Sequence, residues 1–569
     1  MGKKLNILWR VLGLLLLVIG CAKRGSITGG PKDETPPVFL KATPPNFSTN
    51  FDKKEIRLYF DEYVKLKDAQ KQIIISPPMD PAPEITPLGT ASKYVKIKFI
   101  DTLLENTTYS INFGESIVDN NEGNPNSFFR YVFSTGDFLD SLSIKGTISD
   151  AIKKKPDSYI TVAMYEVDEE YTDSIVYNKV PRYITNTLDS IGFNLYNLKE
   201  GTYKLVALKD AANNYLYEPK QDKIGFYEEY ITLPEDTAKF FDFSIFKEQL
   251  DFKAILPKQV SKNEFLFPYE GEKDSMAIKL LSDVPEDYVT RVFPDKEKDT
   301  LHYWFKPFFE ADSLIFEITN SKNYRDTLVA RFKDQYKDSL TITSEIKSTL
   351  PLNDTFSFSG NTPLDSINKS LISLTDKDTL DVPFAIALDS IKNRVQFNFE
   401  KTESNVYNIT MLPEAVKDFI GNVNDTLTFN FRTKELTDYG TIFLTLQNVE
   451  TYPVLVQLTD NQGEVVLEKI MSTEQSLIFD HLNPGDYNLR VIFDTNKNGK
   501  WDTGNFLKRL QPEKISYYPK VISVRANWDL KETFILGQKD SIPIGKQMLQ
   551  KGQGKESEKG GRPRRGRQE

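Results

Sequence analysis

The chain of 569 residues contains one cysteine and two histidines, and this scarcity excludes several kinds of site. A single cysteine cannot form a disulfide within the chain, and a Cys/His zinc site needs three or four such ligands. His302 lies in an aromatic, strand-like stretch where a packed or surface role is expected, and His481 precedes a turn as a loop residue. A G-x-S-x-G elbow, a glycine-rich phosphate loop and a dinucleotide fingerprint are also missing. We therefore expect no enzymatic activity.

Positive charge is in deficit as well. The chain carries 72 Lys and Arg residues against 81 Asp and Glu residues, which gives a net charge of −9. This balance argues against a general nucleic-acid surface, so we expect no nucleic-acid partner. With 81 acidic residues, pairs of carboxylates are inevitable, and none has the setting that a glycosidase pair requires.

The only cysteine follows a short apolar run at the N-terminus. Residues 1–20 combine a basic start with an apolar stretch, residues 11–19, that is too short to span a bilayer stably. The stretch runs into Val-Ile-Gly-Cys, ending at Cys21, which resembles the bacterial lipobox. The resemblance implies that Cys21 carries the lipid (palmitate-type acyl chains) and that Ala22 directs the protein to the outer membrane. A plain signal peptide with an incidental cysteine is the alternative.

Two further segments have little apolar content. Residues 21–37 are rich in Gly and Pro and predict a flexible tether behind the acylated cysteine. Residues 538–569 are rich in Gly, Lys and Arg and predict a disordered basic tail, either solvated or in contact with anionic lipid.

Between these segments the sequence is that of an all-β protein. Short runs of alternating apolar and polar residues, such as Glu-Ile-Arg-Leu-Tyr-Phe from residue 55, recur between turn residues, and aromatic residues make up 12% of the chain. Only short stretches such as residues 413–420 are expected to form helical turns. Its length and its many short strands indicate several β-sandwich domains.

One pair of similar segments identifies a first kind of domain. Residues 109–136 and 407–433 share a Tyr-containing strand, an Asp, a Gly-Asn pair and a closing Phe-x-Thr. The first segment resembles the SbsA-type bacterial Ig-like domain. The resemblance implies an Ig-like domain over residues 38–137 and, from the weaker second copy, another Ig-like unit over 346–435.

A second pair identifies another kind of domain. Residues 198–218 align without gaps to residues 482–502, and Gly-Thr-Ile stands at the start of both units. These Leu-x-x-Gly-x-Tyr-x-Leu strands resemble carboxypeptidase-regulatory-like (prealbumin-like) β-sandwiches, which have no catalytic activity of their own. The resemblance implies sandwiches over 142–247 and 440–537, with a β-rich middle domain over 250–343.

The sharpest local motif is the stretch Asp-Thr-Asn-Lys-Asn-Gly-Lys-Trp-Asp. Its oxygen-bearing residues occupy positions 1, 3, 5 and 9 of a calcium loop: Asp494, Asn496, Asn498 and Asp502. Position 12 is Asn505 where an EF-hand has glutamate, and the first copy has Ala212 in place of one ligand. The motif therefore leaves two interpretations open, a calcium site and an Asx-rich turn between strands.

The whole pattern resembles Ig-like-domain lipoproteins of the Bacteroidota, in which a Gly-Gly-Pro-Lys-Asp-Glu-Thr stretch leads into the first sandwich. The resemblance implies a lipid-anchored outer-membrane protein, with the sandwiches at the cell surface or on the periplasmic face. Its expected role is as a binding or scaffold subunit of an outer-membrane protein complex, such as one that assembles or exports outer-membrane proteins. The alternative is a glycan-binding surface lipoprotein, in which exposed aromatic side chains would stack on sugar rings.

Overall fold

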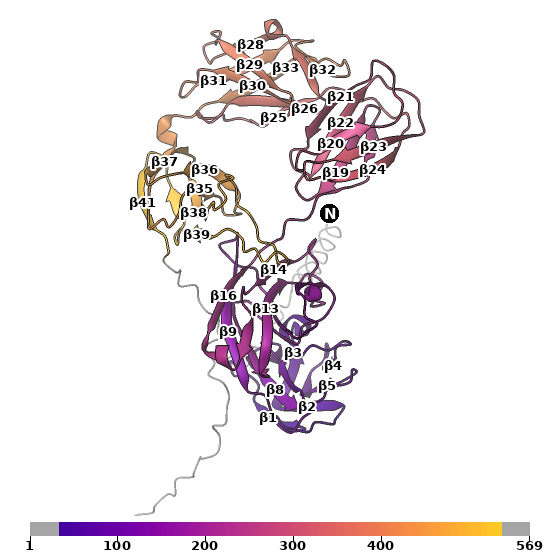
Figure 1. The fold of residues 1–569 in the computed structure, drawn as a ribbon. Helices are drawn as coiled ribbons and strands as arrows, with labels where there is room; N and C mark the ends of the chain where they lie inside the picture. The colour runs from indigo at the N-terminus through magenta and orange to yellow at the C-terminus, as the bar shows by residue number, and fades with distance from the viewer. Residues whose placement is uncertain (1–32, 538–569) are drawn as a thin grey trace, which may run out of the picture. The chain divides into compact units, whose positions relative to one another are not determined.

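The computed structural model describes residues 33–537, and almost all of their regular structure is β-strand (Figure 1). The predicted all-β fold class is confirmed. Apart from one short helix, α2 (Ala69–Gln72), only 3₁₀ turns interrupt the strands in this part of the chain. None of its helices is long and apolar enough to cross a membrane. The described residues divide into two compact units, one reaching Ile75 and including Met79–Leu139, the other formed by Ser76–Pro78 and the chain from Asp140 onward.

The first unit is a sandwich of two antiparallel sheets. One sheet has the order β1-β2-β5-β4 with β7 beside β2, and the other has the order β3-β6-β8. Their bounds are β1 (Phe39–Thr43), β2 (Glu55–Leu66), β3 (Ile74–Ser76), β4 (Glu84–Thr86), β5 (Ser92–Lys98), β6 (Thr108–Asn112), β7 (Ile117–Asp119) and β8 (Arg130–Ser134). Alternate residues of facing strands, such as Ile56, Val95 and Phe133, are fully buried between the sheets.

The second unit contains two segments with the same strand topology, which we call the first repeat (142–247) and the second repeat (440–537). The first repeat has sheets β11-β10-β13-β14, with β15 beside β13, and β12-β9-β16. The second has β36-β35-β38-β39, with β40 beside β38, and β37-β34-β41. In each repeat the last strand runs parallel to the first, and the other pairs are antiparallel.

The strands of the first repeat are β9 (Leu142–Asp150), β10 (Thr161–Glu166), β11 (Tyr183–Asn186), β12 (Gly192–Leu198), β13 (Gly201–Lys209), β14 (Lys223–Phe226), β15 (Ile231–Leu233) and β16 (Phe240–Ile245). Those of the second are β34 (Gly440–Gln447), β35 (Val454–Thr459), β36 (Val465–Met471), β37 (Ser476–Leu482), β38 (Gly485–Phe493), β39 (Ile515–Tyr517), β40 (Ile522–Val524) and β41 (Asp529–Ile535).

The shared Gly-Thr-Ile motif has a steric cause. A Cβ atom on Gly146 would lie 1.8 Å from the carbonyl oxygen of Phe241, and one on Gly440 would lie 2.6 Å from that of Arg525. Both glycines therefore stand where neighbouring backbone comes too close for any side chain.

The predicted middle domain and the predicted second Ig-like unit lie between the repeats in the sequence. The middle domain has sheets β17-β19-β22-β21, with β18 beside β19, and β20-β23-β24. Its strands are β17 (Lys253–Ala254), β18 (Lys258–Ser261), β19 (Glu264–Glu270), β20 (Ala277–Leu280), β21 (Val289–Pro294), β22 (Thr300–Lys306), β23 (Ser313–Thr319) and β24 (Arg325–Arg331).

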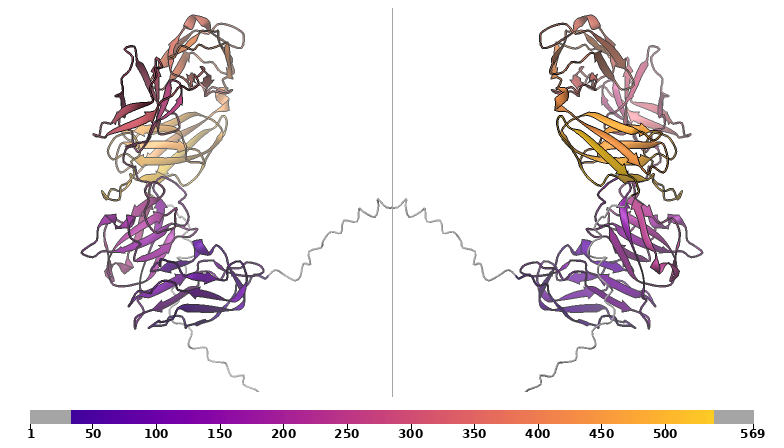
Figure 2. Two further views of the ribbon diagram at one scale, coloured as in Figure 1. Left: turned by 90° about the vertical axis from the view of Figure 1, so that its right-hand side faces the viewer. Right: turned by 90° about the vertical axis from the view of Figure 1, so that its left-hand side faces the viewer.

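The second Ig-like unit has sheets β25-β26-β30-β29, β28-β31-β33 and β27-β32. Its strands are β25 (Ile342–Ser344), β26 (Phe356–Gly360), β27 (Leu364–Ile367), β28 (Ile372–Thr375), β29 (Phe384–Asp389), β30 (Arg394–Phe399), β31 (Val406–Met411), β32 (Val416–Asp418) and β33 (Leu427–Arg432). Figure 2 shows strands throughout these domains in two further views.

The expected helical turn over residues 413–420 is wrong. Strand β32 (Val416–Asp418) occupies the middle of this stretch and pairs with β27. Val416 and Asp418 are buried and Lys417 between them is exposed, which is the period of a strand rather than a helix.

Candidate functional site

The Asp and Gly-Asn residues shared by the two Ig-like units build the same turn. In the first unit Asp119 Oδ1 accepts hydrogen bonds from the backbone N–H of Asn121 (2.8 Å), Glu122 (2.7 Å) and Gly123 (3.2 Å). Its Oδ2 accepts from the N–H of Asn124 at 2.6 Å, and Gly123 has a φ of 82°, which favours glycine. Burial alone would raise the pKa of Asp119, but these four hydrogen bonds hold it below its usual value.

The asparagine of this motif holds the chain that enters the sandwich. In the first Ig-like unit Asn124 Nδ2 donates to the carbonyl oxygen of Asp33 at 2.9 Å. In the second, Asn422 Nδ2 donates to the carbonyl oxygen of Asp338 at 3.0 Å, and Asp418 again accepts the asparagine N–H, at 2.7 Å. The motif therefore fastens the preceding segment, which in the first unit is the end of the predicted tether.

We expect Asp119→Asn to lower the free energy of unfolding of the first Ig-like domain by about 2–3 kcal/mol near neutral pH, because four backbone amides lose a charged acceptor. The stabilisation by Asp119 is present above the unfolded-state pKa of about 4 and is lost as the pH falls through the lower pKa of the folded state. The difference between the two proteins should therefore shrink in acid. Urea unfolding at pH 7 and at pH 3 measures it, and a pH-independent difference would contradict the account.

The four predicted calcium ligands do lie together in one loop after β38. Asp494 accepts hydrogen bonds from the N–H of Asn498 (3.0 Å) and Gly499 (2.9 Å), as expected of the Asx-rich turn. Asn496 and Asn498 both turn their side-chain NH₂ groups toward Asp502 Oδ2, the latter at 2.6 Å. A calcium ion would need these amides to present oxygen instead, because it binds only oxygen ligands.

Glu513 completes this loop and was missed from the sequence. Its Oε1 accepts from the N–H and Oγ1 of Thr495, at 2.7 and 2.8 Å, and its carbonyl oxygen accepts from Trp501 Nε1 at 3.0 Å. It lies outside the twelve positions that a loop motif covers, so no spacing rule pointed to it. Within residues 33–537, no three His, Cys, Asp or Glu side chains are placed to hold a metal ion.

Calcium binding at the Asp494 loop remains a prediction. If it occurs, calcium at 100 times its Kd should stabilise the folded chain by about 2.7 kcal/mol and raise its Tm. Asp502→Ala removes one ligand and should abolish the shift, whereas magnesium at the same concentration should give little. An unchanged Tm in millimolar calcium would contradict calcium binding and show that the loop is only an Asx-rich turn.

The stretch that follows, residues 503–511, lies on the first repeat, and we call it the docking loop. Arg509 donates from Nε to Asp173 at 2.8 Å and from Nη2 to Tyr230 Oη at 2.6 Å. Phe506 is fully buried with its ring 5.4 Å from that of Phe226, and its N–H donates to Glu248 at 2.5 Å. The loop therefore joins the two repeats by an apolar anchor with polar contacts around it.

Charged groups under the docking loop are strongly perturbed. Lys204 is fully buried, and its Nζ donates to the carbonyl oxygens of Tyr227 (2.7 Å) and Glu228 (2.9 Å). Burial, followed by the nearby Arg509, lowers the pKa of Lys204 to about 8. Burial would raise the pKa of Asp173, but its hydrogen bond from Arg509 outweighs this and lowers it.

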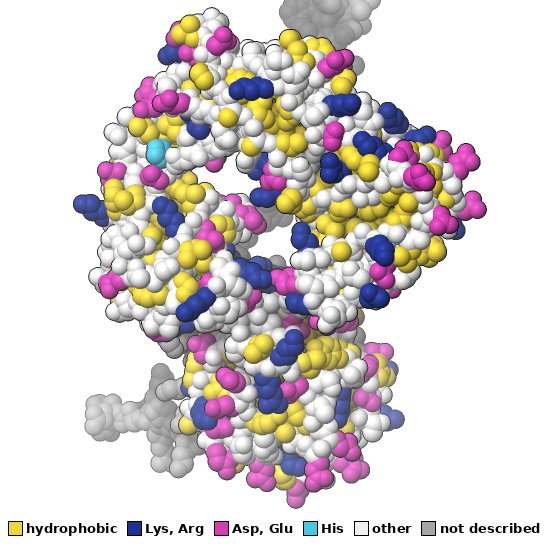
Figure 3. Space-filling view, turned by 45° about the horizontal axis from the view of Figure 1, so that its top comes forward, with side chains coloured by type: hydrophobic (Ala, Val, Ile, Leu, Met, Phe, Trp, Pro, Cys, Tyr) yellow, Lys and Arg dark blue, Asp and Glu magenta, His cyan; other side chains and the backbone are white. Residues whose placement is uncertain are grey.

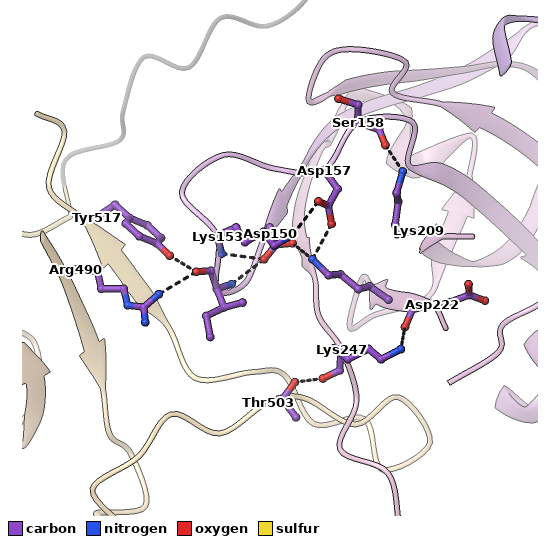
Figure 4. Close-up of polar contacts among 12 residues, drawn as sticks. Asp150, Lys153, Asp157, Ser158, Lys209, Asp222, Lys247, Arg490, Thr503 and Tyr517 are labelled. Atoms are coloured by element: carbon purple, nitrogen blue, oxygen red, sulfur yellow. Dashed lines mark hydrogen bonds and ion pairs between the residues drawn. The ribbon is translucent and has the colours of Figure 1, made fainter. Parts of the chain in front are cut away.

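A cavity of about 530 Å³ lies beside these contacts and is lined by both repeats. Figure 4 shows polar contacts in this region, among them those of Asp150 and Tyr517, which line the cavity. Lys223 lies between Asp150 (2.5 Å) and Asp157 (2.7 Å), and Arg490 Nη1 and Tyr517 Oη both donate to the carbonyl oxygen of Ile152. The contacts of Arg490 and Tyr517 with Ile152 join the two repeats, whereas the Lys223 cluster lies within the first repeat.

The two histidines differ in their surroundings. His302 lies in β22 between Glu264 (2.6 Å) and Asp295 (3.0 Å); burial disfavours its charge, but the two carboxylates outweigh this and raise its pKa. His481 was expected in a loop and lies instead in β37, at the point where the pairing with β34 is irregular. Neither is positioned against a Ser or Cys nucleophile in the part of the chain described.

The predicted signal peptide of residues 1–20, Cys21, the tether up to residue 32 and the basic tail of 538–569 lie outside the described residues. On the face seen in Figure 3, Lys and Arg side chains are interspersed with Asp and Glu, and apolar side chains lie between them.

Comparison with known proteins identifies the first domain. The family model of the bacterial Ig-like domain matches residues 33–135, and none of the curated proteins compared matches the chain. One similar structure is that of the Bacteroides ovatus mixed-linkage glucan utilization locus SGBP-B in complex with mixed-linkage heptasaccharide, at 11% identity, 67% of this chain, 94% of that chain and a TM-score of 0.18.

Two further similar structures are those of an S-layer protein and a pilin subunit. The S-layer protein rSbsC is 12% identical over 85% of this chain and 67% of that chain, with a TM-score of 0.14. BcpA, the major pilin subunit of Bacillus cereus, is 10% identical over 69% of this chain and 99% of that chain, also with a TM-score of 0.14. Residues 33–135 are a bacterial Ig-like domain at the start of an all-β chain.

Proposed function

We propose that the protein is a non-enzymatic outer-membrane lipoprotein, anchored through Cys21, that acts as a binding or scaffold subunit of an outer-membrane protein complex. The lipobox-like sequence before Cys21 supports the anchor. The polar clusters support a scaffold role, because their contacts are structural ones within the chain. The Asp119 turn holds the segment that enters the first domain, and the docking loop joins the two repeats.

One observation carries the proposed binding role. The second repeat leaves the edge strand β36 uncovered, with Val466 45% and Ile470 54% exposed, although apolar side chains are usually placed away from water. An exposed apolar edge is suited to contact with another polypeptide.

The experiment is extraction in mild detergent followed by purification through this protein. A scaffold subunit should co-purify with one or more outer-membrane proteins, in a molar ratio that stays constant after washing. A chain that purifies alone under several detergents would contradict the proposal. Digestion by added protease on intact cells distinguishes the cell surface from the periplasmic face.

A glycan-binding surface lipoprotein is the second candidate, and a group of tyrosines in the first unit favours it. Tyr59 and Tyr94 lie 5.8 Å apart on neighbouring strands, and Tyr63 is 55% exposed on the same strand as Tyr59. Each ring already has a cation over it, for example Arg57 at 5.7 Å from the Tyr94 ring, and a sugar would have to displace these side chains to stack. Retention on immobilised polysaccharide that is lost in Tyr94→Ala would support this role.

A further inference from the structure

Strand β36 combines an open backbone edge with exposed apolar side chains on both of its faces. It is the outermost strand of its sheet and pairs only with β35 among the described strands. The register with β35 puts Val465 and Ile470, 45% and 54% exposed, on one face and Leu467, 37% exposed, on the other, while Val466, 45% exposed, is the extra residue at the irregularity. A strand added beside β36 would cover both faces while pairing with its free N–H and C=O groups.

The usual protection of such edges is only partial here, because β36 contains no proline and Glu468 is its one outward charge. Proteins guard edge strands with outward charges, proline or bulges, which prevent pairing with another chain. The lysine of β36, Lys469, is turned inward: its Nζ donates to the carbonyl oxygen of Ile478 and lies 5.4 Å from the Phe479 ring. The one irregularity in the pairing with β35 lies at the start of the strand, between Val465 and Leu467. The stretch from Leu467 to Met471 is therefore regular and open.

The first repeat shows what covers the same edge. There the corresponding strand is β11, and the N–H of Ile184 donates to Ser76 Oγ at 3.1 Å. Ser76 and Pro77 are buried, and this short segment groups with the second compact unit. The edge of the first repeat is thus contacted at Ile184 by a side-chain oxygen from an earlier segment of the chain.

The strand register identifies the equivalent position in the second repeat. Ile184 lies opposite Ala163, which lies opposite Val206. Glu468 lies opposite Gln457, which lies opposite Arg490, the residue aligned with Val206. The N–H of Glu468 therefore has the place that Ile184 has in the first repeat, and no described segment lies against it.

We infer that β36 is the docking edge for an extended strand of a different protein, a strand that is apolar on both faces and carries a cation near Glu464 and Glu468. This inference rests on the proposed function and names the surface through which the partner binds. Both glutamates are exposed, and they favour a partner segment with positive charge. A second copy of this chain is disfavoured, since pairing through two β36 strands would bring four of these carboxylates into one ladder.

The test uses the full chain in native membranes. The double variant Val466→Lys with Ile470→Lys places positive charge on the exposed edge strand, and Glu468→Pro removes the N–H that matches that of Ile184 in the first repeat. Val521→Lys is the matched control, because Val521 is 49% exposed in the same repeat but away from β36. Each variant must melt within a few degrees of the wild type.

We expect the wild type and Val521→Lys to purify with their outer-membrane partner. The amount of partner recovered with the two edge variants should be at least tenfold lower. In the wild-type complex, amide exchange over 465–471 should slow at least tenfold, and a photo-crosslinker at position 466 should join one extended segment of the partner. Partner recovery that is unchanged in folded edge variants would overturn the inference and leave the proposed function standing. Crosslinks only to a second copy would also overturn it, whereas no partner for the wild type would contradict the proposed function itself.

Discussion

Cells that make the Cys21→Ser protein should contain none of it in floated outer-membrane vesicles, whereas the wild-type protein should be found there almost entirely. The expectation follows from the chemistry of the anchor. Serine offers no thiol for acylation, and each methylene buried in the bilayer contributes about 0.8 kcal/mol to binding. Two or three acyl chains therefore hold a soluble domain firmly, and their loss removes that binding altogether.

The measurement is flotation of membrane vesicles with incorporation of an alkyne-labelled palmitate as a second readout. Lys23→Ser, two residues along the chain, is the control and should change neither flotation nor labelling. A Cys21→Ser protein that still floats with the outer membrane would show that something else attaches the chain. A plain signal peptide with an incidental cysteine predicts no labelling in either protein.

Local repetition made much of the fold predictable. The gapless alignment of residues 198–218 with 482–502 predicts that equivalent residues occupy equivalent places, and the sheets agree: Val206 pairs with Ala163 as Arg490 pairs with Gln457. Shared glycines were also informative, because Gly146 and Gly440 stand where backbone comes too close for a side chain. In these cases the cause of the pattern is local to a strand and its neighbours.

Contacts between distant segments were not predictable. The docking loop contains Phe506, Lys508 and Arg509, which in sequence look like any exposed turn, yet its partners Asp173 and Glu248 stand more than 250 residues earlier. Sequence periodicity relates residues that are close together in the chain, so it does not indicate a contact between segments this far apart. The stretch of residues 413–420 failed for a related reason, because its strand character depends on pairing with β27.

The sequence of β36 itself indicates that this strand is unusual for a sheet edge. Val465, Val466 and Leu467 are consecutive apolar residues in a strand that should alternate if one face met water. A run of this kind predicts a strand covered on both faces, and in the structure no described segment covers it. That mismatch between sequence pattern and exposure is the physical basis for assigning a partner to this strand.

Phe506→Ala should detach the docking loop from the first repeat. Phe506 has no exposed surface, its ring contacts Phe226, and truncating a buried phenylalanine costs about 3–5 kcal/mol. The lost packing energy is that of one loop and not of a domain core, so the sandwiches should remain folded while the loop opens. Arg509 would then leave Asp173 and Tyr230, and the buried Lys204 beneath them would become accessible to water.

Trypsin reports this opening directly, because Lys508 and Arg509 are both cleavage sites within the loop. Cleavage there should be at least tenfold faster in Phe506→Ala. A tenfold larger population of the open loop corresponds to about 1.4 kcal/mol, which is less than the expected loss of packing energy. Leu507→Ala is the matched control: Leu507 is the next residue and is 53% exposed, so its truncation should leave the rate unchanged. Equal rates for both variants and the wild type would mean that the loop is already open in solution. A faster rate in Phe506→Ala alone would show that one buried ring keeps the two repeats joined, and that the scaffold can be opened at a defined place without unfolding it.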